Sequence, residues 1–551
     1  MLIANEDLKA LVLKNGLITE KEFSEIEEEA KNSDFSVSEA LVEKDIISDE
    51  NLGILISDFL KYPFIVLAKI AIPPDVFNII PEKIARRKKV IPFAKDATGV
   101  KLAMTDPSNK ELIQMISKKI GLPIFTYLAT ERDISNAFKV YRKDLQNTFD
   151  QLIKSSEIPM SKIVDLLVNY AAEDKASDIH IEPQEKNSLV RFRIDGILHD
   201  VLLLPKSLHD QIITRIKILS RLRTDEHLSP QDGKMRIALE EEEIDIRVSI
   251  LPVTEGEKVV LRLLSSKFRK FSLVDLGMNE KDLKKVKDAY SKSYGMILST
   301  GPTGSGKTTS IYAIVKLLNT REKNITTIED PAEYRIKGVN QISVNVKTNL
   351  TFANGLRSIL RQDPNIIFVG EIRDSETAGI AVNASLTGHL VLSTLHTNDA
   401  ATALPRLIDM NVEPFLVAST VNVIIAQRLV RKICEICKAT RTITKEELLK
   451  NLPPEVINNY IGDKDVVTIY QGTGCKICHA TGYSGRIGVF EVLEVTKSIR
   501  DLITKRNDAD VISQKAIEEG MTTMLDDGLG KIFKGLTTIE EVLRVTKIQN
   551  K

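Results

Sequence analysis

The chain has 551 residues, enough for about three or four domains, and its apolar share of 43% is ordinary for a globular protein. Lys and Arg total 76, as do Asp and Glu, so the formal net charge is zero, which argues against a protein that coats nucleic acid. No stretch approaches the roughly 18 apolar residues of a membrane span. The first residues carry acids, not the basic and apolar regions of a secretory signal. We therefore expect a cytoplasmic protein without a membrane span.

The first segment, residues 1–62, has the pattern of helices joined by short turns. A weak duplication relates Leu11–Thr19 to Leu41–Ser48, because in each a helix ends, a turn follows, and a Thr or Ser begins the next helix as N-cap. A true repeat and a chance recurrence of helix-end signals explain this pattern equally well. The sequence therefore predicts a helical N-terminal region.

A small α/β domain is predicted for residues 63–145. The apolar runs at Lys88–Phe93 and Lys101–Met104 are typical of strands, and Glu111–Ile120 has the spacing of a helix. The next segment, 146–160, is polar and contains two adjacent serines and a proline, so we interpret it as a linker.

A second N-terminal α/β domain is predicted for residues 161–270. Residues 188–195 and 244–250 alternate apolar and polar side chains, as half-buried strands do. Arg191 and Arg193 lie on the polar side of the first strand. The pattern alone favours a solvated face, and the alternative is an arginine surface that docks against the phosphate site of another domain.

The most specific motif follows a strand predicted at Met296–Thr300. Residues Gly301–Thr308 read Gly-Pro-Thr-Gly-Ser-Gly-Lys-Thr, the nucleotide-binding P-loop pattern, and the apolar spacing after them predicts a helix. Glycines let main-chain N–H groups approach phosphates, Lys307 is placed to reach the β- and γ-phosphates, and the Thr308 hydroxyl is placed to bind Mg²⁺. A glycine-rich turn with a surface lysine is the disfavoured alternative, because strand and helix both flank the motif. The predicted nucleotide-binding residues are Gly301, Thr303, Gly304, Ser305, Gly306, Lys307, Thr308 and Thr309.

Carboxylates follow two further strands of this part of the chain, residues 271–551. Glu329 and Glu333 come directly after a strand predicted at 324–328, and Glu371 ends an apolar run in the manner of a Walker B motif. Acids in these places suit Mg²⁺ or the orientation of an attacking water. We predict all three glutamates as catalytic, with Glu371 also at Mg²⁺ beside Thr308. Which of them is the general base is left open.

Three arginines, Arg357, Arg361 and Arg373, surround the Walker B strand. Arginines near a P-loop stabilise charge on the transferred phosphoryl group, often across a subunit boundary, and the alternative is ordinary ion pairing. His389 and His396 flank the next predicted strand. On the pattern alone, each is more typical of a structural histidine.

The four cysteines form two Cys-x-x-Cys pairs, Cys434 with Cys437 and Cys475 with Cys478. In a reducing compartment such pairs indicate zinc, and four thiolates fill a tetrahedral ion without an open position, so the site is predicted to be structural. The second pair with His479 also matches the c-type haem attachment pattern, although haem leaves the first pair unexplained. We predict a zinc-binding insertion at 433–480, with His479 as a bystander or substitute ligand.

Together these motifs resemble the secretion ATPases of type II secretion and type IV pilus assembly, strongly from about 160 to 550 and more loosely before. The resemblance rests on an aspartate box at 329–333, a Walker B motif at 369–374, a histidine box at 387–400, a glycine-rich signature at 482–488, and upstream motifs at 177–183, 191–196 and 230–233.

The resemblance implies an α/β multidomain fold, in which a RecA-like P-loop ATPase core follows a smaller, PAS-like α/β domain and an N-terminal region of α plus α/β structure. It implies a homohexamer that hydrolyses ATP with Mg²⁺ at the inner face of the cytoplasmic membrane. The ring would move an inner-membrane platform protein so that pilin or pseudopilin subunits join a filament, and the N-terminal region would dock to a membrane-anchored cytoplasmic adaptor. It also places Arg191, Arg193 and His396, with the Walker B arginines, at the nucleotide.

The cysteine pairs and the long N-terminal region are features of assembly-type rather than retraction-type members of this family. Members that bind cyclic di-GMP carry Arg-Leu-Gly at the start of each N-terminal repeat. This chain has Lys9-Ala10-Leu11 and Glu39-Ala40-Leu41 instead, which speaks against that ligand. The resemblance does not separate pilus extension from type II secretion.

Two other functions compete with this interpretation. A P-loop nucleic-acid translocase needs a basic channel with stacking aromatics, whereas this chain is neutral, lacks Trp and is 5% aromatic. A nucleotide-gated scaffold that does not hydrolyse ATP has no need of acids after two strands. We therefore predict an ATPase without a nucleic-acid partner.

Overall fold

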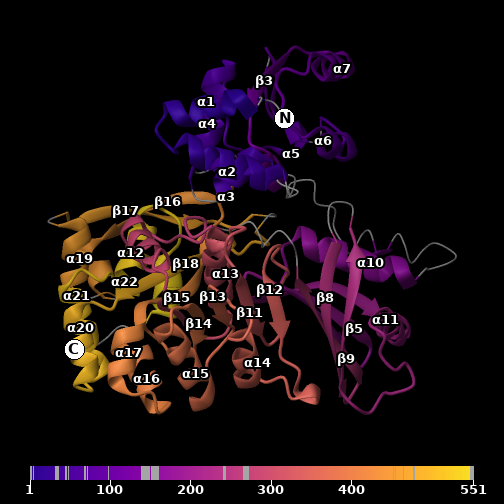
Figure 1. Ribbon diagram of the computed structural model, residues 1–551. Helices are drawn as coiled ribbons and strands as arrows, with labels where there is room; N and C mark the ends of the chain where they lie inside the picture. The colour runs from indigo at the N-terminus through magenta and orange to yellow at the C-terminus, as the bar shows by residue number, and fades with distance from the viewer. Residues whose placement is uncertain are drawn as a thin grey trace. The chain divides into compact units, whose positions relative to one another are not determined.

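A computed structural model describes the chain except residues 1–2, 4, 32–35, 44–45, 48, 68–69, 71, 78, 97, 138–148, 151–159, 240–242, 265–271, 451, 453, 463, 476–477 and 547–551. The chain divides into two compact units, Met1–Val42 with Ile46–Lys270, and Glu43–Asp45 with Phe271–Lys551 (Figure 1). Most of the predicted linker at 146–160, the predicted boundary at 270 and 271, and the predicted N-cap Ser48 lie outside the described residues.

Four helices form the N-terminal end of the first unit. They pack around an apolar cluster that includes the fully buried Leu8, Val12 and Leu41. Thr19 and Glu22 exchange hydrogen bonds at the start of the second helix, as a capping box does, and so stabilise the turn before it. The helices are α1 (Asn5–Lys14), α2 (Glu20–Lys31), α3 (Val37–Glu43) and α4 (Asp49–Leu60).

A three-stranded sheet with four short helices follows. Its strands, β1 (Val90–Asp96), β2 (Gly99–Met104) and β3 (Ile124–Leu128), pair in the order β1-β2-β3. The prediction that the first strand begins at Lys88 is wrong, because β1 begins at Val90. A helix runs to Lys88 and ends at Lys89, which has the left-handed conformation with φ of 49°. The helices are α5 (Pro74–Phe77), α6 (Glu82–Lys88), α7 (Lys110–Ile120) and α8 (Glu131–Ala137).

The rest of the first unit is a six-stranded antiparallel sheet with two helices on one face. The predicted alternation is confirmed, since Val190 and Phe192 are fully buried against the helices. The strand order is β6-β5-β4-β9-β8-β7. The elements are α10 (Met160–Glu173), β4 (Asp178–Pro183), β5 (Asn187–Ile194), β6 (Ile197–Pro205), α11 (Lys206–Leu219), β7 (Gln231–Ala238), β8 (Glu243–Val253) and β9 (Gly256–Leu264).

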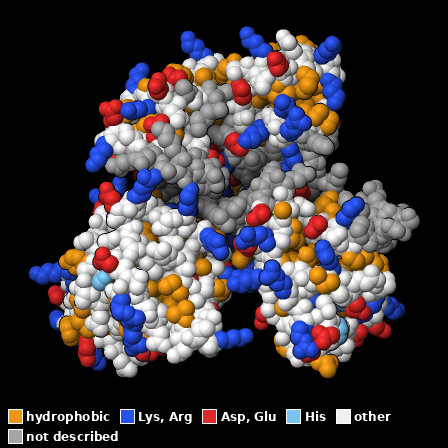
Figure 2. Space-filling view, turned by 45° about the vertical axis from the view of Figure 1, so that its right-hand side comes forward, with side chains coloured by type: hydrophobic (Ala, Val, Ile, Leu, Met, Phe, Trp, Pro, Cys, Tyr) orange, Lys and Arg blue, Asp and Glu red, His pale blue; other side chains and the backbone are white. Residues whose placement is uncertain are grey.

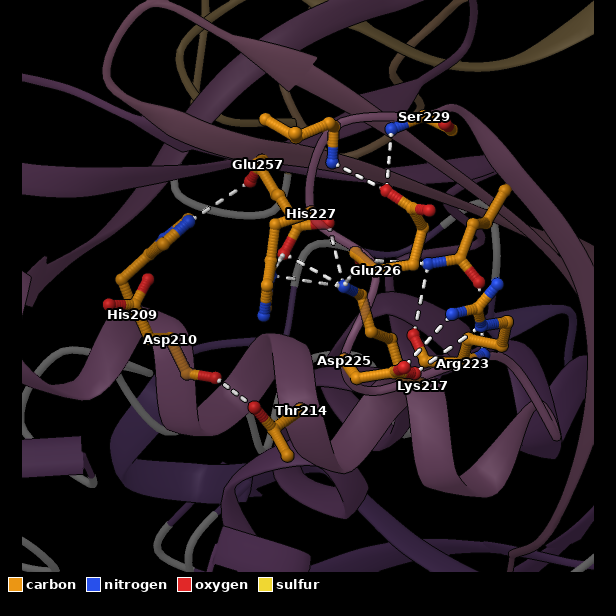
Figure 3. A network of polar contacts seen from close by, with 12 residues as sticks. His209, Asp210, Thr214, Lys217, Arg223, Asp225, Glu226, His227, Ser229 and Glu257 are labelled. Carbon is orange, nitrogen blue, oxygen red and sulfur yellow. Dashed lines mark hydrogen bonds and ion pairs between the residues drawn. The ribbon is translucent and has the colours of Figure 1, made fainter.

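A buried ion pair fixes the loop between α11 and β7 (Figure 3). Lys217 has no exposed side-chain surface, and its Nζ lies 2.8 Å from the carboxylate of Glu257 on β9. The same Nζ donates to the main-chain oxygen of Glu226 at 2.6 Å, and His227 contacts the Glu257 carboxylate at 2.8 Å. The loop is therefore held to the sheet by an ion pair and by polar contacts that join three segments of the chain.

The second unit is built on a seven-stranded sheet of order β12-β11-β13-β14-β10-β15-β18. Six strands pair in parallel, and only β18 at the edge is antiparallel, to β15. The strands are β10 (Gly295–Thr300), β11 (Ile325–Glu329), β12 (Asn340–Ser343), β13 (Ile366–Val369), β14 (Leu390–Leu395), β15 (Val421–Ile433) and β18 (Tyr483–Glu494).

Helices cover both faces of this sheet, because its strands are apolar on both sides. Met296 and Leu298 face one helical layer, and Ile297 between them faces the other. The first layer contains α14 (Phe352–Ile359), α15 (Ser375–Leu386), α16 (Ala403–Asp409), α17 (Pro414–Thr420), α20 (Lys497–Thr504) and α21 (Ala509–Glu518). The second contains α12 (Glu280–Tyr290) and α13 (Lys307–Leu318), which gives a three-layered α/β/α unit.

A two-stranded sheet and short helices follow β15. They are β16 (Lys438–Thr444), α18 (Lys445–Leu449), α19 (Pro454–Ile461) and β17 (Val466–Gly472), and the chain ends with α22 (Met524–Phe533) and α23 (Ile539–Val545); a short turn, η4, spans Val346–Thr348. Within the described part of the chain, no helix is both long and apolar enough to cross a membrane. On the face drawn in Figure 2, basic and acidic side chains are interspersed.

Candidate nucleotide-binding site and metal centre

The carboxyl ends of neighbouring parallel strands bring the predicted motifs to one edge of the sheet. β14 lies between β10 and β13, so the P-loop after β10 is two strands from Glu371 after β13, and His396 follows the strand between them. Ligands of open parallel sheets bind outside this edge. The sheet order therefore joins motifs that are up to 95 residues apart in the sequence, from Gly301 to His396.

The predicted phosphate-binding loop, Gly301–Thr308, has a backbone conformation that its glycines allow. Gly301, Gly304 and Gly306 have φ of 147°, 79° and 91°, values that residues with a Cβ resist. A Cβ on Gly301 would lie 2.5 Å from Ser305 Oγ, whereas a Cβ on Gly304 would meet no atom within 4 Å. The loop is thus packed at its base and open at Gly304, where a ligand has access to the main chain.

Lys307 begins α13 with a side chain turned back over the loop. Its Nζ donates to the main-chain oxygens of Gly301 at 2.8 Å and Pro302 at 3.1 Å. Burial lowers the pKa of Lys307, and the negative charge of Glu371 acts in the opposite direction. Of the other predicted loop residues, Ser305 is buried, Thr303 is exposed, and Thr308 and Thr309 are half-buried on the first turn of α13.

Three predicted residues meet at Glu371. One carboxylate oxygen lies 2.5 Å from the guanidinium of Arg373, and the other lies 3.2 Å from Nε2 of His396. The Glu371 side chain is 13% exposed, so the carboxylate is reachable from outside. The structure therefore joins the Walker B acid, one arginine and the histidine-box His396 into one cluster.

Glu329, the first acid of the aspartate box, faces the interior. It is the last residue of β11, and its carboxylate accepts hydrogen bonds from Thr327 Oγ1 at 2.6 Å, from Gln341 Nε2 at 3.2 Å and from the hydroxyl of Tyr312 on α13. Burial raises its pKa, and the same three donors oppose that rise. The main-chain N–H of Glu333 donates to the Tyr312 hydroxyl at 3.3 Å. Both glutamates of the box are therefore linked to the P-loop helix through Tyr312.

The remaining predicted arginines have other partners. Arg357 on α14 forms an ion pair of 2.5 Å with Glu376 on α15, and Arg361 donates to the main-chain oxygen of Arg357 at 3.0 Å. In the first unit, the ion pairs of Arg191 and Arg193 cross to the neighbouring strand β4, at 2.7 Å to Glu182 and 3.4 Å to Asp178. All four arginines are thus engaged in ordinary ion pairs or hydrogen bonds within their own units.

Two residues of the site were missed by the sequence analysis, Gln427 and Arg428 on β15. Gln427 contacts the P-loop, and Arg428 donates to the main-chain oxygen of Asn398 in the histidine-box loop at 3.1 Å. Burial lowers the pKa of Arg428. A glutamine inside the apolar run Val421–Val430 is the signal that was available, because a buried amide needs partners.

The four cysteines form a compact cluster. The Sγ atoms of Cys434 and Cys475 are 3.8 Å apart, as are those of Cys437 and Cys478, and all four lie within 4.8 Å of one another. A tetrahedral zinc ion with Zn–S bonds of about 2.3 Å separates its sulfurs by about 3.8 Å. The geometry therefore suits a metal such as zinc.

The surroundings of the thiols are compatible with metal binding. Burial raises the pKa of Cys434 to about 12, so a metal would have to displace its proton. Burial also works against ionisation of Cys478, but N–H groups of Cys475 and Gly482, at 3.1 and 3.3 Å, lower its pKa. Both Cys-x-x-Cys pairs contribute to one cluster, whereas haem attachment would use only the second pair. His479 does not belong to the cluster.

A parallel α/β/α sheet with a P-loop and a Walker B acid at its carboxyl edge defines a RecA-like P-loop ATPase fold, as predicted. The family profile described as Type II/IV secretion system protein matches residues 154–544, and that of the MshEN domain matches residues 60–147. The chain belongs to the type II/IV secretion system protein family, and the resemblance drawn from its motifs is confirmed.

Similar proteins give the same result. The chain is 37% identical over 561 residues to the type IV pilus assembly ATPase PilB of Myxococcus xanthus (strain DK1622), and the alignment covers 97% of this chain and 98% of that protein. It is 45% identical over 401 residues to the type II secretion system protein E of Pseudomonas aeruginosa, covering 73% and 78% of the two chains. The X-ray structure of the Legionella pneumophila ATPase DotB, at 20% identity, a TM-score of 0.53 and coverage of 71% and 97%, shares the fold. The homologues indicate an ATPase of type IV pilus assembly or type II secretion.

Proposed function

We propose that this protein hydrolyses ATP with Mg²⁺ and uses the energy to assemble a type IV pilus or a type II secretion pseudopilus. The observation that carries the proposal is the meeting of Lys307, Glu371 and His396 at the carboxyl edge of one sheet, in a chain that is similar over almost its whole length to a pilus assembly ATPase. At this edge of the sheet, the P-loop binds the phosphates, and the cluster around Glu371 is the place where the water attacks.

The residues present fit a nucleotide triphosphate. Lys307 donates to two main-chain carbonyls. Phosphate oxygens of a bound nucleotide would take the place of these carbonyls, and because the phosphate oxygens are charged, they would form stronger hydrogen bonds with Lys307. Ser305 Oγ is buried without a hydrogen-bond partner, and Gly304 opens outward. We assign Thr308 and Glu371 to Mg²⁺, which when bound would neutralise charge on the phosphates.

The glutamates take different roles in this proposal. Glu371 orients the attacking water, because its carboxylate is accessible and is held between Arg373 and His396. Glu329 positions α13 through Tyr312, since the chain's own donors occupy its carboxylate. Glu333, half-buried on the same loop as Glu329, is the second candidate for the water.

We further propose a homohexamer at the cytoplasmic face of the inner membrane, which acts on a platform protein and docks to a membrane-anchored adaptor through residues 1–62. Arg357 on α14 and Arg361, two residues after the end of that helix, are exposed. We propose that they reach a nucleotide when subunits close, together with Arg191 and Arg193 of the first unit. The domain division proposed is 1–62, 63–145, a linker at 146–160, 161–270 and 271–551. The four cysteines are proposed to bind Zn²⁺ and so stabilise the insertion at 433–480.

The test is phosphate release by the full chain with MgATP. Lys307→Ala should lose at least about 100-fold in rate, the scale of removing a preorganised charge from a transition state. Lys347→Ala, an exposed lysine of the same unit, is the matched control and should keep the wild-type rate. Undiminished hydrolysis by Lys307→Ala would refute the proposal.

The same assay separates the alternatives. DNA or RNA should leave the rate unchanged, and stimulation by either would instead favour a nucleic-acid translocase. ATP binding by wild type without any phosphate release would favour a nucleotide-gated scaffold.

A further inference from the structure

The side-chain amide of Gln427 on β15 forms two hydrogen bonds, one with the phosphate-binding loop and one with the helix α13 that follows the loop. It is 2% exposed and follows the buried apolar residues Val423–Ala426 of the strand. Its Nε2 donates to the main-chain oxygen of Ser305 at 2.7 Å, and its Oε1 accepts from the hydroxyl of Ser310 on α13 at 2.7 Å. One buried amide therefore holds both the loop and the helix that follows it.

Two loop glycines leave the space that this contact needs. A Cβ on Gly301 would lie 2.6 Å from the main-chain oxygen of Gln427, and a Cβ on Gly306 would lie 2.9 Å from its Nε2. A Cβ on Gly301 would clash with the main chain of β15, and a Cβ on Gly306 would push the Gln427 amide out of its place; both glycines also have positive φ angles.

The orientation of one peptide group follows from the contact. The C=O of Ser305 and the N–H of Gly306 belong to the same planar trans peptide unit, in which the two bonds point in opposite directions. Because the Ser305 oxygen is bonded to Gln427 on β15, the Gly306 N–H is directed away from β15. Main-chain N–H groups at the start of α13 are the donors that a phosphate would meet.

We propose that Gln427 is a positioning residue of the nucleotide site, which orients the Ser305–Gly306 peptide so that its N–H donates to a bound phosphate. The inference rests on the proposed function, since it requires that this loop binds a nucleotide triphosphate. Without Gln427, the peptide can rotate, and the Ser305 oxygen and the Ser310 hydroxyl lose their buried partner.

The test compares Gln427→Met with Ser310→Ala in the full chain. Methionine has a similar length but makes neither hydrogen bond, so KM for ATP and Kd for ADP should each rise about tenfold, the effect of one neutral hydrogen bond, while kcat changes less than threefold. Ser310→Ala removes only the helix end of the contact, and its KM should remain within about threefold of wild type. Amide hydrogen exchange at residues 301–306 should be faster in Gln427→Met alone.

Each outcome decides the inference. A wild-type KM and Kd in Gln427→Met, or a fall in kcat at constant KM, would overturn it while wild-type hydrolysis upholds the proposed function. Gln427→Glu is the second variant: when ionised, it keeps the shape and the bond from Ser310 but cannot donate to Ser305, so the same rise in KM is expected at a pH at which the carboxylate is ionised. If both variants fail to fold, Gln427 has a structural role and the inference is wrong. If wild type itself neither binds nor hydrolyses ATP, both proposals fall.

Discussion

Replacing Glu491 by glutamine should stabilise the second unit at pH 8, although most substitutions of buried residues destabilise a protein. Glu491 lies on β18 and is 8% exposed. Its carboxylate accepts a hydrogen bond from the main-chain N–H of Ala400, the last residue of the histidine box, at 2.9 Å. Burial raises its pKa to about 7, and the nearby carboxylate of Asp399 adds to the rise.

The sign and size of the effect follow from this pKa. An acid with a raised pKa in the folded state leaves stability intact below its ordinary pKa of 4.5 and removes stability as the pH rises through about 7. The interval of about 2.5 pH units corresponds to about 3 kcal/mol of unfolding free energy. Glutamine does not ionise, and its one oxygen can still accept from Ala400, although it cannot also accept the main-chain hydrogen bond from Met524. The stability of Glu491→Gln relative to wild type should therefore increase by about 2–3 kcal/mol between pH 5 and pH 8.

Denaturant unfolding of both proteins at several pH values between 5 and 9 measures this difference. Glu494→Gln, at the exposed end of the same strand, is the matched control and should follow the wild-type curve. Hydrogen exchange of the Ala400 amide reports the local contact, and it should slow in Glu491→Gln at pH 8 relative to wild type after correction for intrinsic rate. A difference between the proteins that is the same at pH 5 and pH 8, or that favours wild type at pH 8, would refute the reasoning.

Three other predictions concern stability and metal content. Burial opposes ionisation of Glu541, but hydrogen bonds from two arginines lower its pKa to about 2. Glu541→Gln should therefore lower the free energy of unfolding by about 3 kcal/mol at pH 7. In denaturant titrations this loss should become smaller as the pH falls from 4.5 toward 2. Lys217→Met removes the lysine that is paired with the buried Glu257 and should lower the free energy of unfolding by about 3–5 kcal/mol (Figure 3). The double variant Lys217→Met, Glu257→Leu should lose less, and unfolding followed by circular dichroism measures both. Cys437→Ser should lose the one zinc ion per chain that metal analysis of wild type is expected to find.

Each of these predictions has a result that contradicts it. A Glu541→Gln cost that is unchanged from pH 7 to pH 3 would show that the carboxylate pKa is not lowered. Equal costs for the single and double variants at Lys217 would remove the argument from an unpaired buried charge. Wild type purified without metal, with all four thiols reactive, would show that the cysteine cluster does not bind zinc.

Local patterns were predictable from the sequence because they depend on neighbours in the chain. The strand, glycine loop and helix at Met296–Leu318 follow from side-chain period and backbone freedom within some twenty residues, and the structure has all three. The start of β1 was not predictable in this way, because the left-handed Lys89 ends a helix that the apolar run alone did not indicate.

What the sequence by itself determined is the chemistry available: a P-loop, acids after two strands and two cysteine pairs at ligand spacing. Only the tertiary structure decided which of these groups meet. Glu371 lies between Arg373 and His396, whereas Glu329 is buried under Tyr312, although both are glutamates at strand ends. The physical reason is that burial and hydrogen-bond partnership are properties of segments brought together by the sheet order, as for Gln427, whose partner Ser305 is 122 positions away.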